Sequence, residues 1–137
     1  MNLHIEIITP EKVVYKDDVS EIIVPTETGE IAILPDHVNL LTKVLPGEMI
    51  IKKGNHEHFI AITGGFLEIA NNQVNILADY AVRAEDIEIA RAQEAQKRAE
   101  HKIKEQSTDK DFRIAEAELQ KALLQLKVAN KRKRHIR

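Results

Sequence analysis

The sequence lacks several features on which common classes of protein depend. It has no cysteine, which excludes a disulfide framework and a thiolate metal site. Its longest apolar runs, such as Ile31–Leu34 and Phe59–Ile62, have four residues, whereas a membrane-spanning helix needs about 20. The N-terminus shows no basic segment followed by an apolar one, so we expect no signal peptide. The chain is therefore predicted to associate with a membrane only through a partner.

The motifs of a self-sufficient catalyst are also missing. Neither serine, Ser20 or Ser107, lies in a GxSxG elbow, and no Walker A or GxGxxG loop is present. None of the six histidines belongs to an HExxH pair, so all six are interpreted as surface residues. The five aromatic residues do not interleave with basic ones, which argues against stacking on nucleic acid. We predict no catalytic residues, no metal, no required cofactor and no nucleic-acid partner.

The pattern of apolar residues changes near residue 84. Before that point they alternate with polar residues or form short β-branched runs, which is typical of strands. After it they recur every three or four positions and alanine dominates, which is typical of helices. The change predicts an α+β protein of two bodies: a β-sandwich domain over residues 1–84 and a helical domain over residues 85–137.

Residues 1–84 predict an antiparallel β-sandwich of about eight to ten short strands. Leu3–Ile7 alternates strictly and is expected to be a half-buried strand. A tight turn is expected at Asn71-Asn72, and Gly64-Gly65 is expected to bend or bulge a strand. The polar residues Lys16-Asp17-Asp18 are expected to separate two strands.

Residues 85–137 predict two antiparallel helices joined by a short loop. Asp86 is a candidate N-cap for a first helix that starts at Ile87 and ends near Gln106. Thr108, with Asp111 three residues later, resembles a capping box for the second helix. Apolar residues at spacings of three and four give each helix one narrow stripe rich in alanine. The stripes are Ala92, Ala95, Ala99 and Ile103 in the first helix, and Phe112, Ala115, Leu119, Ala122, Leu126 and Ala129 in the second.

These stripes predict that the helical hairpin is weakly held. An alanine buries much less apolar area than a leucine, so at roughly 25 cal/mol per Å² such a seam stabilises little. The hairpin carries a net charge of +4, from fourteen Lys and Arg and ten Asp and Glu, whereas residues 1–84 carry −6, from six and twelve. Two interpretations are open: a switch that docks on alternative surfaces, or an appendage that docks permanently.

Four motifs, taken in order, resemble those of the ATP synthase ε subunit family. Residues 29–41 read GEIAILPDHVNLL and are similar to its GELGILPxHxPLL signature. Residues 63–68 read TGGFLE and resemble its SGGFxE strand. Ile76–Asp79 and Ala90–Ala92 also fit, and the order and spacing agree across residues 3–130.

The resemblance implies a noncatalytic subunit in the central stalk of a rotary, proton-driven ATP synthase. The sandwich would sit against the γ subunit and the membrane-embedded c-ring, and would help to couple rotation to catalysis. The hairpin would fold against the sandwich or extend into the α/β catalytic head, where it inhibits ATP hydrolysis and its basic surface meets an acidic loop of β. The implied location is peripheral, on the cytoplasmic side of the cell membrane. Within the signature, Glu30 and His37 are expected to contact the c-ring or γ.

The resemblance also implies a regulatory ATP site. Several bacterial members of the family bind ATP through an I/L-D-x-x-R-A motif at the start of the first helix, and residues 87–92 here read IEIARA. In the implied site the acidic residue binds the adenine amino group or the ribose, and the basic residues pair with phosphates. Its members would be Glu88, Arg91, Ala92, Arg98 and Lys121.

The sequence departs from the ATP-binding pattern in three places. Glu88 replaces an aspartate, Gln125 stands where relatives have a second arginine, and Val82 stands where some have a carboxylate. The alternative is an ordinary helical ion pair between Glu88 and Arg91, three residues apart. For the whole chain, the alternative is a freestanding adaptor or RNA-binding module built on a β-sandwich and a basic hairpin. Copurification with γ and the catalytic head, or with nucleic acid, distinguishes these functions.

Overall fold

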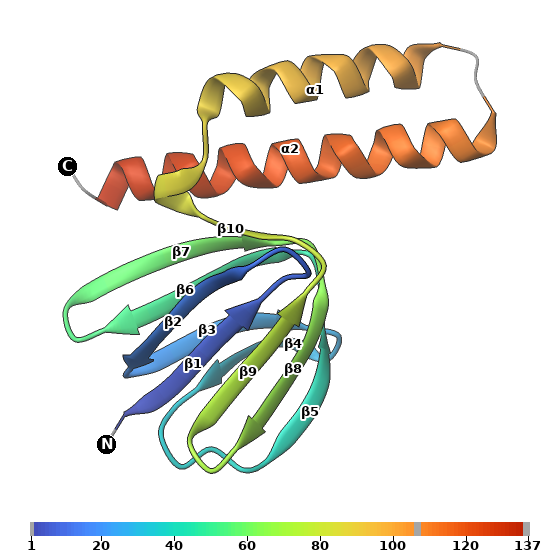
Figure 1. The fold of residues 1–137 in the computed structure, drawn as a ribbon. Coiled ribbons are helices and arrows are strands. Elements are labelled where there is room, and N and C mark those ends of the chain that lie inside the picture. The colour runs from blue at the N-terminus through green and yellow to red at the C-terminus, as the bar shows by residue number, and fades with distance from the viewer. Residues whose placement is uncertain (1, 106–107, 136–137) are drawn as a thin grey trace. The chain divides into compact units, whose positions relative to one another are not determined.

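The computed structural model describes residues 2–105 and 108–135, without the side chains of 133–135 (Figure 1). The chain divides into two compact units, residues 1–84 and residues 85–137. Strands make up the first unit and helices the second, apart from a short 3-10 turn where they join. The predicted α+β class, a sandwich followed by a helical hairpin, is confirmed.

Within the described residues, the first unit contains ten strands, in agreement with the predicted number. Most of their short apolar stretches are separated by Gly, Pro, Asn or Asp residues, which favour turns. The strands are β1 (Leu3–Ile8), β2 (Val13–Val19), β3 (Glu21–Thr26), β4 (Gly29–Ile33), β5 (Leu40–Val44), β6 (Gly47–Lys53), β7 (His56–Ile62), β8 (Gly65–Ala70), β9 (Gln73–Ala78) and β10 (Ala81–Arg83).

Hydrogen bonds link these strands in the order β10-β7-β6-β3-β5-β8-β9-β1-β2, with β4 paired to β3. Alternate side chains point into one apolar core, as the buried Leu3, Ile5 and Ile7 of β1 do. One pair departs from the antiparallel pattern, since β1 and β9 run parallel, with Ile5 opposite Val74. These two strands are far apart in the sequence, so no hairpin turn dictates their relative direction.

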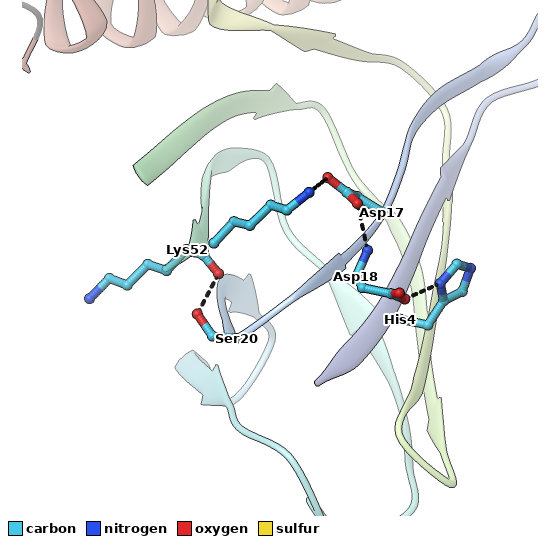
Figure 2. Close-up of polar contacts among 6 residues, drawn as sticks. His4, Asp17, Asp18, Ser20 and Lys52 are labelled. Atoms are coloured by element: carbon cyan, nitrogen blue, oxygen red, sulfur yellow. Dashed lines mark hydrogen bonds and ion pairs between the residues drawn. The ribbon is translucent and has the colours of Figure 1, made fainter. Parts of the chain in front are cut away.

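The expected break at Lys16-Asp17-Asp18 is wrong, because β2 runs through these residues without interruption. β2 is a terminal strand of the order, where charged side chains are tolerated and protect the edge. Asp17 shares the face of the buried Tyr15 and Val19, and its Oδ2 accepts a hydrogen bond of 2.6 Å from Lys53 Nζ. The chain instead turns at Ser20, whose hydroxyl donates to the Lys52 carbonyl at 2.8 Å (Figure 2).

The turn at Asn71-Asn72 forms as predicted. Both residues have positive φ, 51° and 62°, and Ala70 pairs with Gln73 across the two-residue loop. Two successive residues of this kind form a type I′ turn, whose twist matches that of the strands that it joins. Asparagine tolerates the left-handed conformation better than most residues, which explains its presence at both positions.

The second unit is an antiparallel hairpin of α1 (Ile89–Lys104) and α2 (Asp109–His135), preceded by the 3-10 turn η1 (Ala84–Asp86) (Figure 1). The predicted N-cap is wrong: Asp86 lies in η1, and Glu88 occupies the cap position without a side-chain cap bond. α1 ends at Lys104, two residues before the predicted end. Thr108 does cap α2, since its Oγ1 accepts the Asp111 N–H at 3.2 Å, which forms half of the predicted capping box.

The seam between the helices consists chiefly of alanine. Ala92 and Ala99 of α1 and Ala115 and Ala122 of α2 are buried, as the stripes predict. Phe112 does not join them and is exposed. The reason is angular: at 100° per residue, Phe112 lies about 60° around the helix from Ala115, and the small alanines take the closest approach. No helix among the described residues is long and apolar enough to cross a membrane.

Candidate functional site

The start of α1 is the first candidate site, because residues 87–92 resemble an ATP-binding motif. Glu88 Oε2 and Arg91 Nε form an ion pair of 3.0 Å, and both side chains are largely exposed. The buried Ala92 next to them packs in the helix seam. Because Glu88 is the extended N-cap residue of α1, this is an exposed i,i+3 pair at the helix end, and such surface pairs stabilise little. A nucleotide would have to compete with this pair for the Arg91 guanidinium.

The other basic residues of the predicted ATP site lie farther along the hairpin. Lys102 of α1 and Glu118 of α2 approach to 4.0 Å, which fixes the register of the two antiparallel helices. Four residues back on α1 is Arg98, and four residues on along α2 is position 122, so Arg98 and Lys121 lie at nearly the same level. Arg91 is seven residues earlier, about 10 Å along the axis at 1.5 Å per residue. The hairpin therefore sets Arg98 and Lys121 at nearly the same axial level, about 10 Å along the axis from Arg91.

The two predicted stalk-contact residues lie at opposite ends of β4. Glu30 is exposed at the start of the strand, opposite Pro25 of β3. His37 follows the strand in the loop 34–39, where its N–H donates to the Leu34 carbonyl at 3.2 Å and its Nδ1 donates to the Val38 carbonyl at 2.8 Å. From Glu30 to Ile33 the strand alone spans about 10 Å. One motif in the sequence thus places its two predicted contact residues at separate positions.

Sequence reasoning missed an apolar row on the outer face of the sandwich. Leu41 of β5, Phe66 of β8 and Leu77 of β9 are 72%, 58% and 59% exposed. Phe66 pairs directly with Leu77 on one side and with Lys43 on the other, and Leu41 pairs with Glu68. Leu41 is thus diagonal to Phe66, and the three form one exposed apolar group of the kind that can serve as an interaction surface. The signal was visible, because these residues stand at alternate positions where an outward side chain should be polar.

A cluster of polar side chains lies at the edge of the sheet, on β1, β2 and β6 (Figure 2). His4 Nδ1 lies 2.8 Å from Asp18 Oδ1, which ties β1 to β2. The pKa of Asp17 is held below its usual value, first by the hydrogen bond from Lys53 and second by the backbone N–H of Asp18. Among the described residues, no group of three His, Asp or Glu side chains gathers closely enough to hold a metal ion. We interpret this cluster as edge protection.

Comparison with protein families matches the two units separately. The family described as the beta-sandwich domain of the ATP synthase delta/epsilon chain matches residues 2–84. The long alpha-helix domain of the same chain matches residues 85–130. Together these matches cover nearly the whole sequence, in the order in which the units occur.

Several curated relatives are similar along almost their entire length. An ATP synthase epsilon chain from Thioalkalivibrio sulfidiphilus is 38% identical and aligns with 100% of this chain and 99% of its own. One from Caldanaerobacter subterraneus subsp. tengcongensis is 43% identical, with 93% and 94% covered. One from Chloroflexus aggregans is 44% identical, with 94% and 93% covered.

Solved structures show the same fold at lower sequence identity. A chain of the Euglena gracilis mitochondrial ATP synthase superposes with a TM-score of 0.73 at 20% identity, covering 87% of this chain and 76% of that one. A chain of the Tetrahymena thermophila mitochondrial ATP synthase, from a structure of the central stalk and c-ring, gives 0.64 at 20% identity, covering 94% and 97%.

Proposed function

The chain belongs to the ATP synthase delta/epsilon chain family, among its epsilon subunits, and we propose that it is a noncatalytic part of the central stalk that couples rotation to catalysis and restrains ATP hydrolysis. The observation that carries the proposal is the pair of independent units, each matched by its own family domain in the right order. The subunit is peripheral, on the cytoplasmic side of the cell membrane, and reaches the membrane through the complex.

Affinity purification of the tagged chain from its own cells tests this assignment. We expect the γ subunit, the c-ring and the α/β head to copurify in fixed proportion with it. Recovery of nucleic acid without these subunits would favour the adaptor or RNA-binding interpretation instead.

The sandwich supplies the permanent contacts of the proposed subunit. The exposed row of Leu41, Phe66 and Leu77 offers γ an apolar surface whose burial favours binding. The β3–β4 turn, with Glu27 and Glu30 both exposed, is acidic and suits the polar loops of the c-ring. Because Glu30 is separated from the loop 34–39, the sandwich can contact two different subunits. In this proposal the c-ring contacts the β3–β4 turn, and γ contacts the loop and the apolar row.

The hairpin supplies the regulatory contact. Its alanine seam contributes little to holding the two helices together, and Phe112 and Leu123 of α2 remain exposed. Residues 85–137 also carry the net charge of +4. A basic hairpin with exposed apolar side chains is suited to dock in the catalytic head, next to the acidic loop of β.

Reversing the charge at Glu30 should weaken coupling without unfolding the subunit. Because Glu30 is exposed at the start of β4, the substitution Glu30→Lys removes no core contact. In reconstituted vesicles we expect less proton pumping per ATP hydrolysed. The matched control is Glu11→Lys, the same substitution at an exposed position outside both proposed contacts. Equal pumping efficiency for Glu30→Lys and the wild type would contradict a c-ring contact at this turn.

We also propose that the hairpin binds ATP as a regulatory ligand through Glu88, Arg91, Arg98 and Lys121. Arg98 and Lys121 stand at nearly the same height along the hairpin axis, which supports a phosphate site between the helices. Arg91, paired with Glu88, lies about 10 Å farther along the axis. A ligand that bridges both helices favours the compact hairpin, by RT ln(1 + [L]/Kd). The longer Glu88 side chain and the loss of an arginine at Gln125 imply weaker binding than in relatives with the complete motif.

Calorimetric titration of the isolated chain with ATP tests this site. We expect a heat of binding at millimolar ATP that is lost in Arg91→Ala, because that substitution removes the guanidinium of the motif. The control is Lys97→Ala, which removes an exposed cation six residues later, about 240° around the helix. The absence of heat, or equal loss in both variants, would show that the Glu88–Arg91 pair is only structural.

A further inference from the structure

Two loops that are distant in sequence are joined by a reciprocal pair of hydrogen bonds. The Asp36 backbone N–H donates to Asn72 Oδ1 at 2.6 Å. In return, Asn72 Nδ2 donates to Asp36 Oδ1 at 3.2 Å. The partners are 36 positions apart, so the pair is a tertiary contact rather than a local turn. We call it the Asp36–Asn72 latch.

One side of the latch is firmly anchored. Asn72 stands in the type I′ turn between β8 and β9, and its carbonyl accepts the His4 N–H of β1 at 2.9 Å. Its φ of 62° is fixed by that turn. The Asn72 amide is therefore presented from a backbone that three strands hold in place.

The other side of the latch is a loop whose own hydrogen bonds are local, from the His37 N–H to Leu34 and from His37 Nδ1 to Val38. Residues 34–39 connect β4 to β5 and belong to no strand. Asp36 has a φ of 66°, in the left-handed region, which costs most residues about 1 kcal/mol or more. The loop nevertheless presents Leu34 and Val38, which are 52% and 76% exposed, and leads directly into Leu41 of the apolar row.

We propose that Asn72 is a positioning residue that holds the loop 34–39 in the conformation that docks on the γ subunit. The inference rests on the proposed function, in which the loop and the apolar row face γ. Apolar side chains on an ordered loop contribute more to affinity than those on a mobile loop. The reason is that the conformational entropy of the loop is already lost in the free subunit, so binding does not have to supply it. Asn72 does this without contacting γ itself.

The latch is separable from the stability of the sandwich. Asp36 is exposed and Asn72 is half-buried, and neither belongs to the apolar core. The substitution Asn72→Gly removes both side-chain bonds and keeps a residue that adopts positive φ readily. The matched control is Asn71→Gly, which makes the same change in the same turn and leaves both latch bonds in place.

The test measures binding of the full chain to the ATP synthase F1 sector from which this subunit has been removed. We expect Asn72→Gly to weaken binding roughly tenfold, the loss of about 1.4 kcal/mol, with an unchanged thermal unfolding midpoint. Asn71→Gly should bind as the wild type does. Equal affinities for the two variants would overturn the latch proposal.

A reversed pair gives a rescue that a general structural defect would not show. Asn72→Asp alone sets two carboxylates face to face and should weaken binding near neutral pH. Adding Asp36→Asn restores a donor on one side and an acceptor on the other, while the backbone N–H of residue 36 still finds a carboxylate oxygen. We expect the double variant to recover most of the wild-type affinity. Failure of the rescue would also overturn the proposal.

A loop variant separates the latch from the function on which it rests. Val38→Asp places a charge at the most exposed apolar position of the loop and leaves both latch bonds intact. If Val38→Asp binds as tightly as the wild type, the loop does not face γ, and the proposed contact fails together with the latch. If Val38→Asp binds weakly while Asn72→Gly binds normally, the contact stands and only the positioning role of Asn72 fails.

Discussion

Removing residues 85–137 should raise ATP hydrolysis by the complex while leaving a folded and assembled sandwich. The effect should be large, because the hairpin is proposed to be the whole of the inhibitory element. If the complex spends half to nine-tenths of its time blocked, its release gives roughly a two- to tenfold increase. The measurement is steady-state hydrolysis by complex lacking the subunit, reconstituted with either the full chain or residues 1–84.

The truncation is informative because the sandwich has its own core. The buried cluster of the first unit draws on residues from Leu3 to Ala81 and on none of the hairpin. Circular dichroism and equal copurification with γ serve as controls for folding and assembly. Equal hydrolysis with both chains at every nucleotide concentration would contradict an inhibitory role for the hairpin.

A single methyl group at Gly65 should destabilise the sandwich severely. Gly65 has a φ of 150°, and a Cβ built there would lie 2.0 Å from the Leu77 carbonyl oxygen and 2.9 Å from the Ala78 Cα. Both neighbours are backbone atoms of β9, held by the pairing of β8 with β9, so the clash can be relieved only by separating the strands. We expect Gly65→Ala to lower the free energy of unfolding by about 3–5 kcal/mol.

Chemical denaturation of the full chain, followed through the β-sheet signal, measures this effect. The control is Gly54→Ala, which also stands at positive φ, 61°, but whose added Cβ would meet nothing within 4 Å. Its cost is then only that of the left-handed backbone, about 1–2 kcal/mol. A Gly65→Ala variant no less stable than Gly54→Ala would show that β8 and β9 can separate locally at little cost.

Features set by neighbours in the sequence could be predicted from it. The change in the spacing of apolar residues near residue 84 predicted the two units. A strand or helix that buries one face must carry its apolar residues at the period of that face. The Asn71-Asn72 turn and the Thr108 cap followed from local backbone chemistry. Four motifs in register were sufficient to indicate the family.

Features that depend on which distant segments meet could not be predicted. The continuity of β2 through Asp17 depends on the edge position of that strand and on Lys53 of β6, which supplies the partner for the carboxylate. The parallel pairing of β1 with β9 was likewise decided by the packing of remote strands.

The candidate contact sites divide in the same way. The sequence by itself determined which side chains are available, including Glu30, His37 and the Glu88–Arg91 pair, because residue type and local spacing fix their chemistry. Only the tertiary structure decided that Asp36, in the loop after β4, meets Asn72 from 36 positions away. The physical reason is that a strand or helix sets geometry over a few residues, whereas the pairing of remote strands follows from filling one common core.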